Sequence, residues 1–190
     1  SSKIAGIKNI YHYPLFKKKN LHLVEAAKNF TEKSLNIKDC PTETNFKVDL
    51  SKAEKYKKNK LKKIVLGISS SGPTTKWGSE NFTSLIKKIN NINIYYFYLL
   101  CGPDDENDAK KIIEQIKEKN CESLALKDIS EIVYYIYCSD IFIGNDSFGH
   151  HVSSQMNKPS FIFLLDTPKA YSDYSKNQNR IIPPHINIEE

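Results

Sequence analysis

Residues 140–165, DIFIGNDSFGHHVSSQMNKPSFIFLL, decide the fold that we expect for this chain. Two apolar runs, at 141–143 and 160–165, enclose a polar turn and a segment at 148–156 that we interpret as a short helix. Strand, turn, helix and strand in this order form the unit from which parallel sheets are built. The turn then lies at the carboxyl end of a buried strand, where open α/β sheets bind their ligands. The first turn of the helix also offers backbone N–H groups to an anion.

The same alternation extends toward the N-terminus. Apolar runs predict strands at 64–70, 93–101 and 123–126, and helical spacing predicts helices at 79–89, 109–116 and 130–138. Five strands and four helices in strict alternation predict an α/β fold, a Rossmann-like parallel sheet with helices on both faces. We place this domain at residues 61–190.

The first 60 residues do not follow the alternation. Residues 20–35 form one amphipathic pattern, and the polar stretch 39–63 contains one weak strand pattern at 46–50. We expect residues 1–60 to be a remnant of an N-terminal domain and an interdomain connector. The polar and aromatic tail from residue 167 is expected to fold back over another part of the protein.

Composition limits the class of protein. A hydrophobic share of 39% with 26% charged residues fits a soluble globular protein, and no apolar run approaches the roughly 20 residues of a membrane span. No secretory signal opens the sequence, so we expect a cytoplasmic location. The four cysteines form no Cys-x-x-Cys pair, so no zinc site or redox motif is predicted.

The net charge of +6 is unevenly distributed. Residues 1–63 hold 16 lysines and 6 acidic residues, and the basic excess is concentrated at 17–19 and 52–63. Two interpretations remain open, a solvated linker and a surface that meets lipid-linked phosphates or anionic lipid at the periphery of the inner membrane. A nucleic-acid patch is the third interpretation, and we predict no nucleic-acid partner because no aromatic-and-basic binding motif accompanies the lysines.

A second polar loop follows the first predicted strand. Residues 67–77 read GISSSGPTTKW, in which Ser70 and Ser71 can hold phosphate and Lys76 can supply a countercharge. The spacing is neither that of a Walker P-loop nor that of a dinucleotide fingerprint. In a parallel sheet this loop emerges at the same edge as the turn at 144–148 and as Asp105 and Glu106. Carboxylates suit sugar hydroxyls and the lysine suits phosphate, so the combination favours a sugar nucleotide as the ligand.

Several of these residues also have structural interpretations. Asp146 could cap the helix at 148–156. His150 is interpreted as a packing or surface residue, and Trp77 as a packing residue. Only the motif described next points to a functional role for His151.

The two loops resemble those of the heptosyltransferase family, the family 9 glycosyltransferases of the GT-B fold, in their C-terminal half. In that family a small-residue loop ends in Lys-x-Trp or Lys-Trp, as in residues 69–77. The second motif is Asp-Ser/Thr-Gly-x-x-His followed by small residues and a proline, and residues 146–159 are similar. Phe148 stands where the family has glycine.

The resemblance implies a donor site for a nucleotide sugar, usually ADP-heptose, as substrate, with no cofactor and no metal. The donor-binding residues that we expect are Ser70, Ser71, Lys76, Asp105, Glu106, Asn145, Asp146, Ser147, Gly149 and His151.

The implied reaction is inverting transfer to a lipopolysaccharide-type or other glycan or lipid-linked acceptor. The general base would lie in the N-terminal domain, so we expect these 190 residues to need that domain for activity. The alternatives are another GT-B enzyme, such as a sugar-nucleotide epimerase, or a non-catalytic nucleotide-sugar-binding module.

Overall fold

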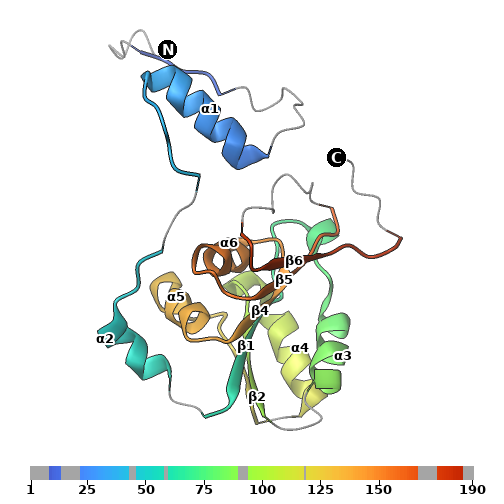
Figure 1. Ribbon diagram of the computed structural model, residues 1–190. Coiled ribbons are helices and arrows are strands. Elements are labelled where there is room, and N and C mark those ends of the chain that lie inside the picture. Colours follow the sequence, from blue (N-terminus) through green and yellow to red (C-terminus); the bar gives the residue numbers. More distant parts are fainter. Residues whose placement is uncertain are drawn as a thin grey trace.

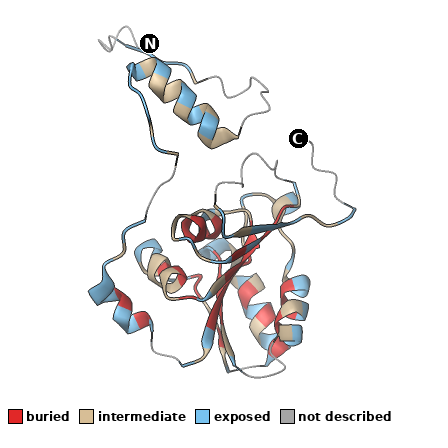
Figure 2. Cartoon of the chain, viewed as in Figure 1, coloured by how far each residue is buried: buried red, intermediate tan, exposed pale blue. Residues whose placement is uncertain are grey.

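The computed structural model describes residues 9–13, 22–42, 46–57, 60–89, 94–117, 119–166 and 175–185. Its main body is a parallel sheet with helices packed on both faces (Figure 1). Buried residues concentrate in the strands and on the helix faces that meet them (Figure 2). The predicted α/β, Rossmann-like class is therefore confirmed.

Six strands form the sheet, in the order β3-β2-β1-β4-β5-β6. Their bounds are β1 (Lys62–Gly67), β2 (Tyr95–Leu100), β3 (Cys121–Ser123), β4 (Ile141–Asn145), β5 (Ser160–Phe163) and β6 (Gln178–Ile181). All neighbouring strands pair in parallel, and Gly67 of β1 lies opposite Gly144 of β4. The chain order reverses between β1 and β4, which makes the crevice above these two strands the topological switch point of the sheet.

Two apolar cores hold the helices to the two faces of the sheet. On one face, α3 (Ser79–Ile89) and α4 (Glu106–Ile116) bury Phe82, Ile86 and Ile112. On the other, α5 (Ile129–Tyr137) and α6 (Phe148–Gln155) bury Ile136 and Val152. Strands β1, β2 and β4 send alternate side chains into both cores, which explains their continuous apolar sequences.

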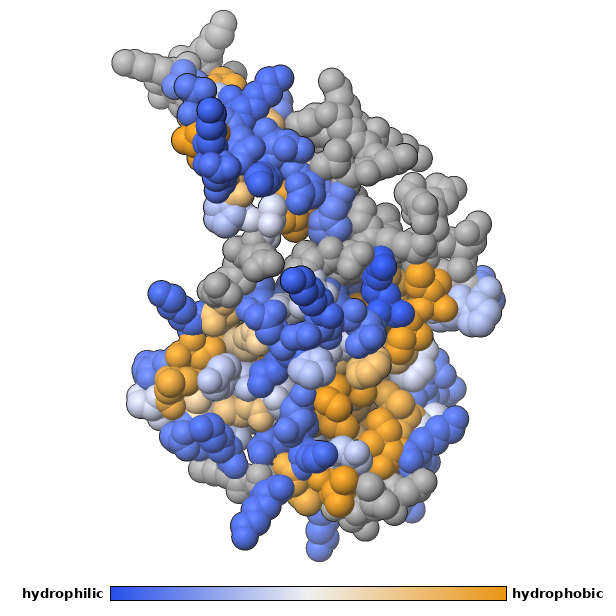
Figure 3. All heavy atoms as spheres, viewed as in Figure 1, coloured by the Kyte–Doolittle hydropathy of each residue, from blue (hydrophilic) through white to orange (hydrophobic). Residues whose placement is uncertain are grey.

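The segments before β1 differ in how much they contact the α/β body. Helix α1 (Leu23–Leu35) has no fully buried residue and stands apart from the sheet, and its visible side is mostly hydrophilic (Figures 1 and 3). By contrast, α2 (Leu50–Ala53) and the 3-10 helix η1 (Glu54–Tyr56) pack on the α/β body, burying Ala53 and Tyr56. Residues 50–56 therefore contact the domain that we predicted to begin at residue 61.

The predicted strands and the observed ones differ at several places. The weak strand at 46–50 is wrong, because Asp49 accepts a hydrogen bond from the Ser51 backbone and caps a helix that begins at Leu50. The strand predicted at 123–126 lies at 121–123, since the buried Leu124 and Ala125 follow the strand rather than belong to it. Strand β6 was not predicted, because its sequence QNRI is polar and pairs only at the sheet edge.

No helix among the described residues is long and apolar enough to cross a membrane. The predicted domain boundary at residues 60 and 61 remains a prediction, as does the folding back of the tail before residue 175.

Candidate functional site

The candidate site lies at the carboxyl edge of the sheet, above β1 and β4. The loop after β1 contains the 3-10 helix η2 (Pro73–Thr75) and leads into α3, whereas the turn after β4 leads into α6. Since α3 and α6 cover opposite faces of the sheet, these two loops lead to opposite faces from the switch point, where sheets of this topology bind their ligands in a crevice. The loop after β2, with the 3-10 helix η4 (Pro103–Asp105), borders the same edge.

Backbone contact forms the floor of this crevice. A Cβ atom on Gly144 would lie 2.7 Å from both the Cα and the carbonyl oxygen of Gly67, and a Cβ atom on Gly67 would lie 2.7 Å from the ring of Phe142. Glycine at 144 therefore permits the close approach of the two backbones, and glycine at 67 leaves room for the Phe142 ring.

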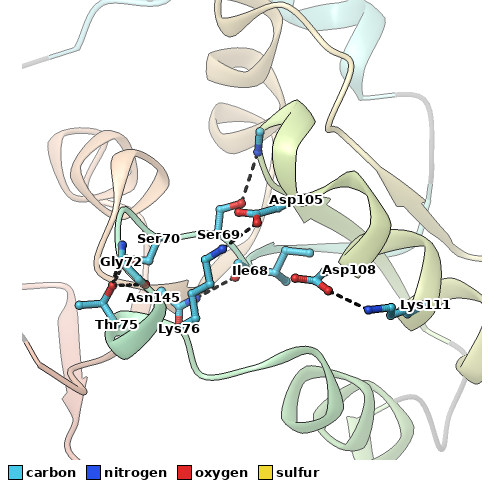
Figure 4. A network of polar contacts seen from close by, with 11 residues as sticks. Ile68, Ser69, Ser70, Gly72, Thr75, Lys76, Asp105, Asp108, Lys111 and Asn145 are labelled. Carbon is cyan, nitrogen blue, oxygen red and sulfur yellow. Dashed lines mark hydrogen bonds and ion pairs between the residues drawn. The ribbon is translucent and has the colours of Figure 1, made fainter.

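Asn145, the last residue of β4, ties the two loops together (Figure 4). Its side chain is fully buried, its Nδ2 donates to the Ile68 carbonyl at 2.9 Å, and its Oδ1 accepts from the Trp77 backbone N–H at 2.9 Å. Both ends of the amide are thus used within the protein. We predicted Asn145 as a donor-binding residue, and the structure gives it a clear role in fixing the start and the end of the loop that carries Lys76.

Lys76 and Asp105 are brought together although they lie on different loops. The Lys76 ammonium donates to Asp105 Oδ1 at 2.7 Å, and both side chains are mostly buried (Figure 4). Burial raises the pKa of Asp105, but the hydrogen bonds from Lys76 and Ser69 outweigh burial and hold that pKa below its ordinary value. Lys76 and Asp105, both predicted as donor-binding residues, therefore satisfy each other's charge within the protein.

The small hydroxyl residues of the loop form a local network. Ser70 Oγ lies 2.6 Å from Thr75 Oγ1 and donates to the Asp146 carbonyl at 3.2 Å, which links the β1 loop to the β4 turn. Ser71, by contrast, is exposed and available to solvent. Glu106 is half-buried and its carboxylate lies 3.0 Å from the ammonium group of Lys110 on the next turn of α4, so it forms an ion pair within its own helix.

The turn before α6 presents the helix N-terminus to the crevice. Ser147 occupies the N-cap position with an extended backbone, and its side chain makes no capping hydrogen bond. Phe148, the first residue of α6, has 45% of its surface exposed. Gly149 is buried, and a Cβ atom there would lie 2.5 Å from Leu100 Cδ2 and 2.7 Å from the Phe142 ring. Gly149 thus allows α6 to sit close against the sheet.

Asp146 does not cap α6 but bonds to a buried histidine. His150 is fully buried, and its Nδ1 lies 2.6 Å from Asp146 Oδ1. Its Nε2 contacts the side-chain amide nitrogen of Gln178 on β6, which donates to it. The short contact between His150 Nδ1 and Asp146 Oδ1 holds the carboxylate in one orientation.

His151 is the more accessible of the two histidines, with 45% of its side chain exposed and its Nε2 3.8 Å from Asp146 Oδ1. Partial burial and the neighbouring His150 lower its pKa, and the attraction of Asp146 only partly offsets them. Potential metal-ligand atoms of Asp146, His150 and His151 lie within 4.8 Å of one another. Because both ring nitrogens of His150 already have hydrogen-bond partners, we interpret this group as a hydrogen-bonded network.

Sequence reasoning missed the contribution of His150 and Gln178. The interval of four residues between Asp146 and His150 was a usable signal, since residues so spaced share a helix face. No signal in the sequence pointed to Gln178, because β6 itself was not predicted. Trp77 is a packing residue as predicted, stacked on Phe163 with ring centroids 3.9 Å apart.

Fold and site together define a Rossmann-like α/β domain whose ligand crevice lies at the switch point of a parallel sheet. The comparisons with known proteins make the assignment specific. Residues 7–187 match the model of glycosyltransferase family 9 (heptosyltransferase), and the chain belongs to this family.

Individual relatives agree with the family. Lipopolysaccharide heptosyltransferase 1 of Campylobacter coli is 28% identical over 163 residues, which cover 82% of this chain and 47% of that protein. The family 9 glycosyltransferase of Veillonella parvula has a similar fold, with a TM-score of 0.74 at 17% identity, covering 88% of this chain and 50% of the other. The E. coli heptosyltransferase WaaC with ADP also has a similar fold, with a TM-score of 0.70 at 19% identity, covering 93% of this chain and 54% of the other. The chain thus spans about half the length of these relatives.

Proposed function

We propose that this chain is the donor-binding half of a heptosyltransferase-like glycosyltransferase, which holds a nucleotide sugar such as ADP-heptose for transfer to a glycan acceptor. The observation that carries the proposal is the convergence of the Lys76 loop, the Asp146 side chain and the N-terminus of α6 at one crevice. A cation and a helix N-terminus suit a diphosphate, and a fixed carboxylate suits sugar hydroxyls.

Each group has a proposed role in binding. Lys76, Ser70 and Ser71 contact the diphosphate together with Ser147 and the first backbone N–H groups of α6, which Gly149 brings close to the sheet. Asp146 accepts hydrogen bonds from sugar hydroxyls, with His151 beside it. Asp105 and Glu106 face the ribose. Because Lys76 donates to Asp105 Oδ1 at 2.7 Å, the lysine can contact the diphosphate while Asp105 holds it in position.

The proposed reaction breaks the bond between the sugar and the diphosphate while an acceptor hydroxyl attacks from the opposite face, so the configuration inverts. Lys76 and the positive end of α6 stabilise the negative charge that develops on the leaving diphosphate. The acceptor loses its proton to a base of the N-terminal domain. We therefore propose that these 190 residues bind the donor and do not transfer the sugar by themselves.

The relatives support an ADP-linked donor. The E. coli enzyme WaaC has been solved with ADP and with ADP-2-deoxy-2-fluoro heptose. Phe148 is the residue at which this chain differs from the family motif, and its exposed ring at the start of α6 is placed to affect which donor fits.

The acceptor that we propose is a lipopolysaccharide-type or other lipid-linked glycan, handled in the cytoplasm. Ion pairs speak against the proposed membrane contact through the basic stretch 52–63. Lys52, Lys55 and Lys57 all lie within 4.0 Å of a carboxylate, so part of this charge is neutralised within the protein. Residues 17–19 lie outside the described residues.

Calorimetry with ADP, UDP and GDP tests the donor site in the chain as it stands. We expect weak binding with a preference for ADP, about tenfold weaker ADP binding in Lys76→Ala, and about tenfold weaker binding of an ADP-sugar in Asp146→Asn, as for the loss of one charge-assisted hydrogen bond. The matched controls are Lys87→Ala and Asp104→Asn, which change exposed residues away from the contacts described. Equal affinity for the three nucleotides, or unchanged binding by both site variants, would reject the proposed site.

A further inference from the structure

A second cavity lies on the α5 side of the sheet. It has a volume of about 420 Å³ and is bounded by β2, β3, α5 and η1. The described residues that line it include none of those proposed for the donor site. Its volume falls within the range of small-molecule sites, which is roughly 300–1,000 Å³.

Tyrosine rings form the walls of this cavity. Tyr98 of β2 and Tyr135 of α5 meet edge to face with ring centroids 5.0 Å apart, and Tyr56 of η1 meets Tyr135 in the same way at 4.9 Å. Tyr96 lies beside Tyr98 at 5.1 Å. Aromatic rings from three separate elements thus surround one space, and aromatic faces attract cations.

Two carboxylates complete the lining, each fixed by a tyrosine hydroxyl. Tyr96 donates to Glu122 Oε2 at 3.1 Å, and Tyr56 donates to Glu131 Oε1 at 3.1 Å. A carboxylate has acceptor sites on both oxygens, so each one can accept further hydrogen bonds from a ligand. Burial and the nearby Glu122 raise the pKa of Tyr96 to about 12, so the cavity disfavours a further negative charge.

The protein already places one ammonium group at this cavity. Lys55 Nζ lies 4.7 Å from the centroid of the Tyr56 ring and 3.9 Å from Glu131 Oε1. Its side chain is 60% exposed, so Lys55 can leave for solvent without losing buried packing. The contacts of Lys55 are those that an amine ligand would make.

We propose that this cavity is a binding site for a small aliphatic amine, whose ammonium group enters the space that the tyrosine rings line, bonds to Glu122 and Glu131, and displaces Lys55. A primary ammonium fits better than a quaternary one because its N–H groups can donate to the two carboxylates. Lys55 acts as an internal competitor that lowers the affinity of the empty site for free amine. The proposal is independent of the donor site, since it uses other residues and another ligand chemistry.

Calorimetric titration of the chain with 1,4-diaminobutane at constant ionic strength tests the proposal. We expect saturable binding that Glu122→Gln weakens at least about threefold and that Lys55→Ala strengthens by a similar factor, because the competing ammonium is removed. Lys52→Ala, a change of an exposed lysine three residues away, serves as the control and should leave binding unchanged.

Two results would overturn the site. One is a 1,4-diaminobutane titration that gives no saturable binding heat above the heat of a control titration with sodium chloride. The other is equal affinity in Lys55→Ala and the unmodified chain, a test that does not depend on any buried substitution and therefore stands even if Glu122→Gln fails to fold.

Discussion

Asn145→Ala should loosen the candidate site and destabilise the domain together. The substitution removes two hydrogen bonds of 2.9 Å, each contributing about 1 kcal/mol, and leaves the carbonyl of the buried Ile68 without this partner, which costs roughly 1–3 kcal/mol more. We therefore expect the free energy of unfolding to fall by about 3–5 kcal/mol, a large fraction of the roughly 5–15 kcal/mol that stabilises a typical domain.

The protein carries its own reporter for this experiment. Trp77 is the only tryptophan of the chain, its backbone N–H is one of the two groups that Asn145 binds, and its ring stacks on Phe163. Urea unfolding followed by tryptophan fluorescence should show a lower midpoint, and emission in the native state should shift to the red as the Trp77 ring becomes more exposed. Asn107→Ala, at an exposed position of α4, is the matched control. An Asn145→Ala variant with the original midpoint and the original emission would refute the reasoning.

Three further predictions concern the same edge of the sheet. Gly149→Ala should destabilise the protein by about 1–2 kcal/mol through overcrowding, whereas Gly102→Ala, where a Cβ meets no atom within 4 Å, should be nearly neutral in the same urea assay. The pKa of Asp105 is lowered in the folded protein, so its ionised carboxylate should contribute fully to stability above about pH 5, and this contribution should disappear as the pH falls through the folded-state pKa. The difference in unfolding free energy between the unmodified chain and Asp105→Asn should therefore shrink on acidification and not on alkalisation. His151 should titrate by NMR below the ordinary histidine pKa of about 6.5, so its protonation should cost stability as the pH falls below that value, and a titration above it would contradict the geometry described.

Strands buried on both faces were the easiest part of the fold to predict. The runs at β1, β2, β4 and β5 are apolar because helices cover both sides of the sheet, so their sequences carry the signal directly. Strand β6 lies at the edge and has exposed residues at three of its four positions, so its sequence resembles a loop. The stretch 46–50 shows a further limit of prediction from local patterns. Its alternation is typical of a strand, but Asp49 caps a helix that begins at Leu50.

The location of the candidate site followed from topology, but the contacts within it did not. Parallel strands necessarily bring the loops after β1, β2 and β4 to one edge, so grouping Lys76, Asp105 and Asp146 required no side-chain information. That Lys76 would pair with Asp105, or that Asn145 would turn inward, depends on distances between elements that no local pattern encodes. The partner of His150 comes from a strand 28 residues further along the chain.

The glycine pair at the base of the crevice limits how this protein can diversify. A side chain on Gly144 would press on the Gly67 backbone and force β1 and β4 apart, and a side chain on Gly67 would press on the Phe142 ring. Evolutionary change in ligand preference is consequently confined to the rim, where Ser71 and Phe148 are exposed and can be replaced without disturbing the sheet. Such an arrangement separates the constant part of the domain from the part that selection can alter, and it makes rim substitutions the natural route for engineering a different donor preference.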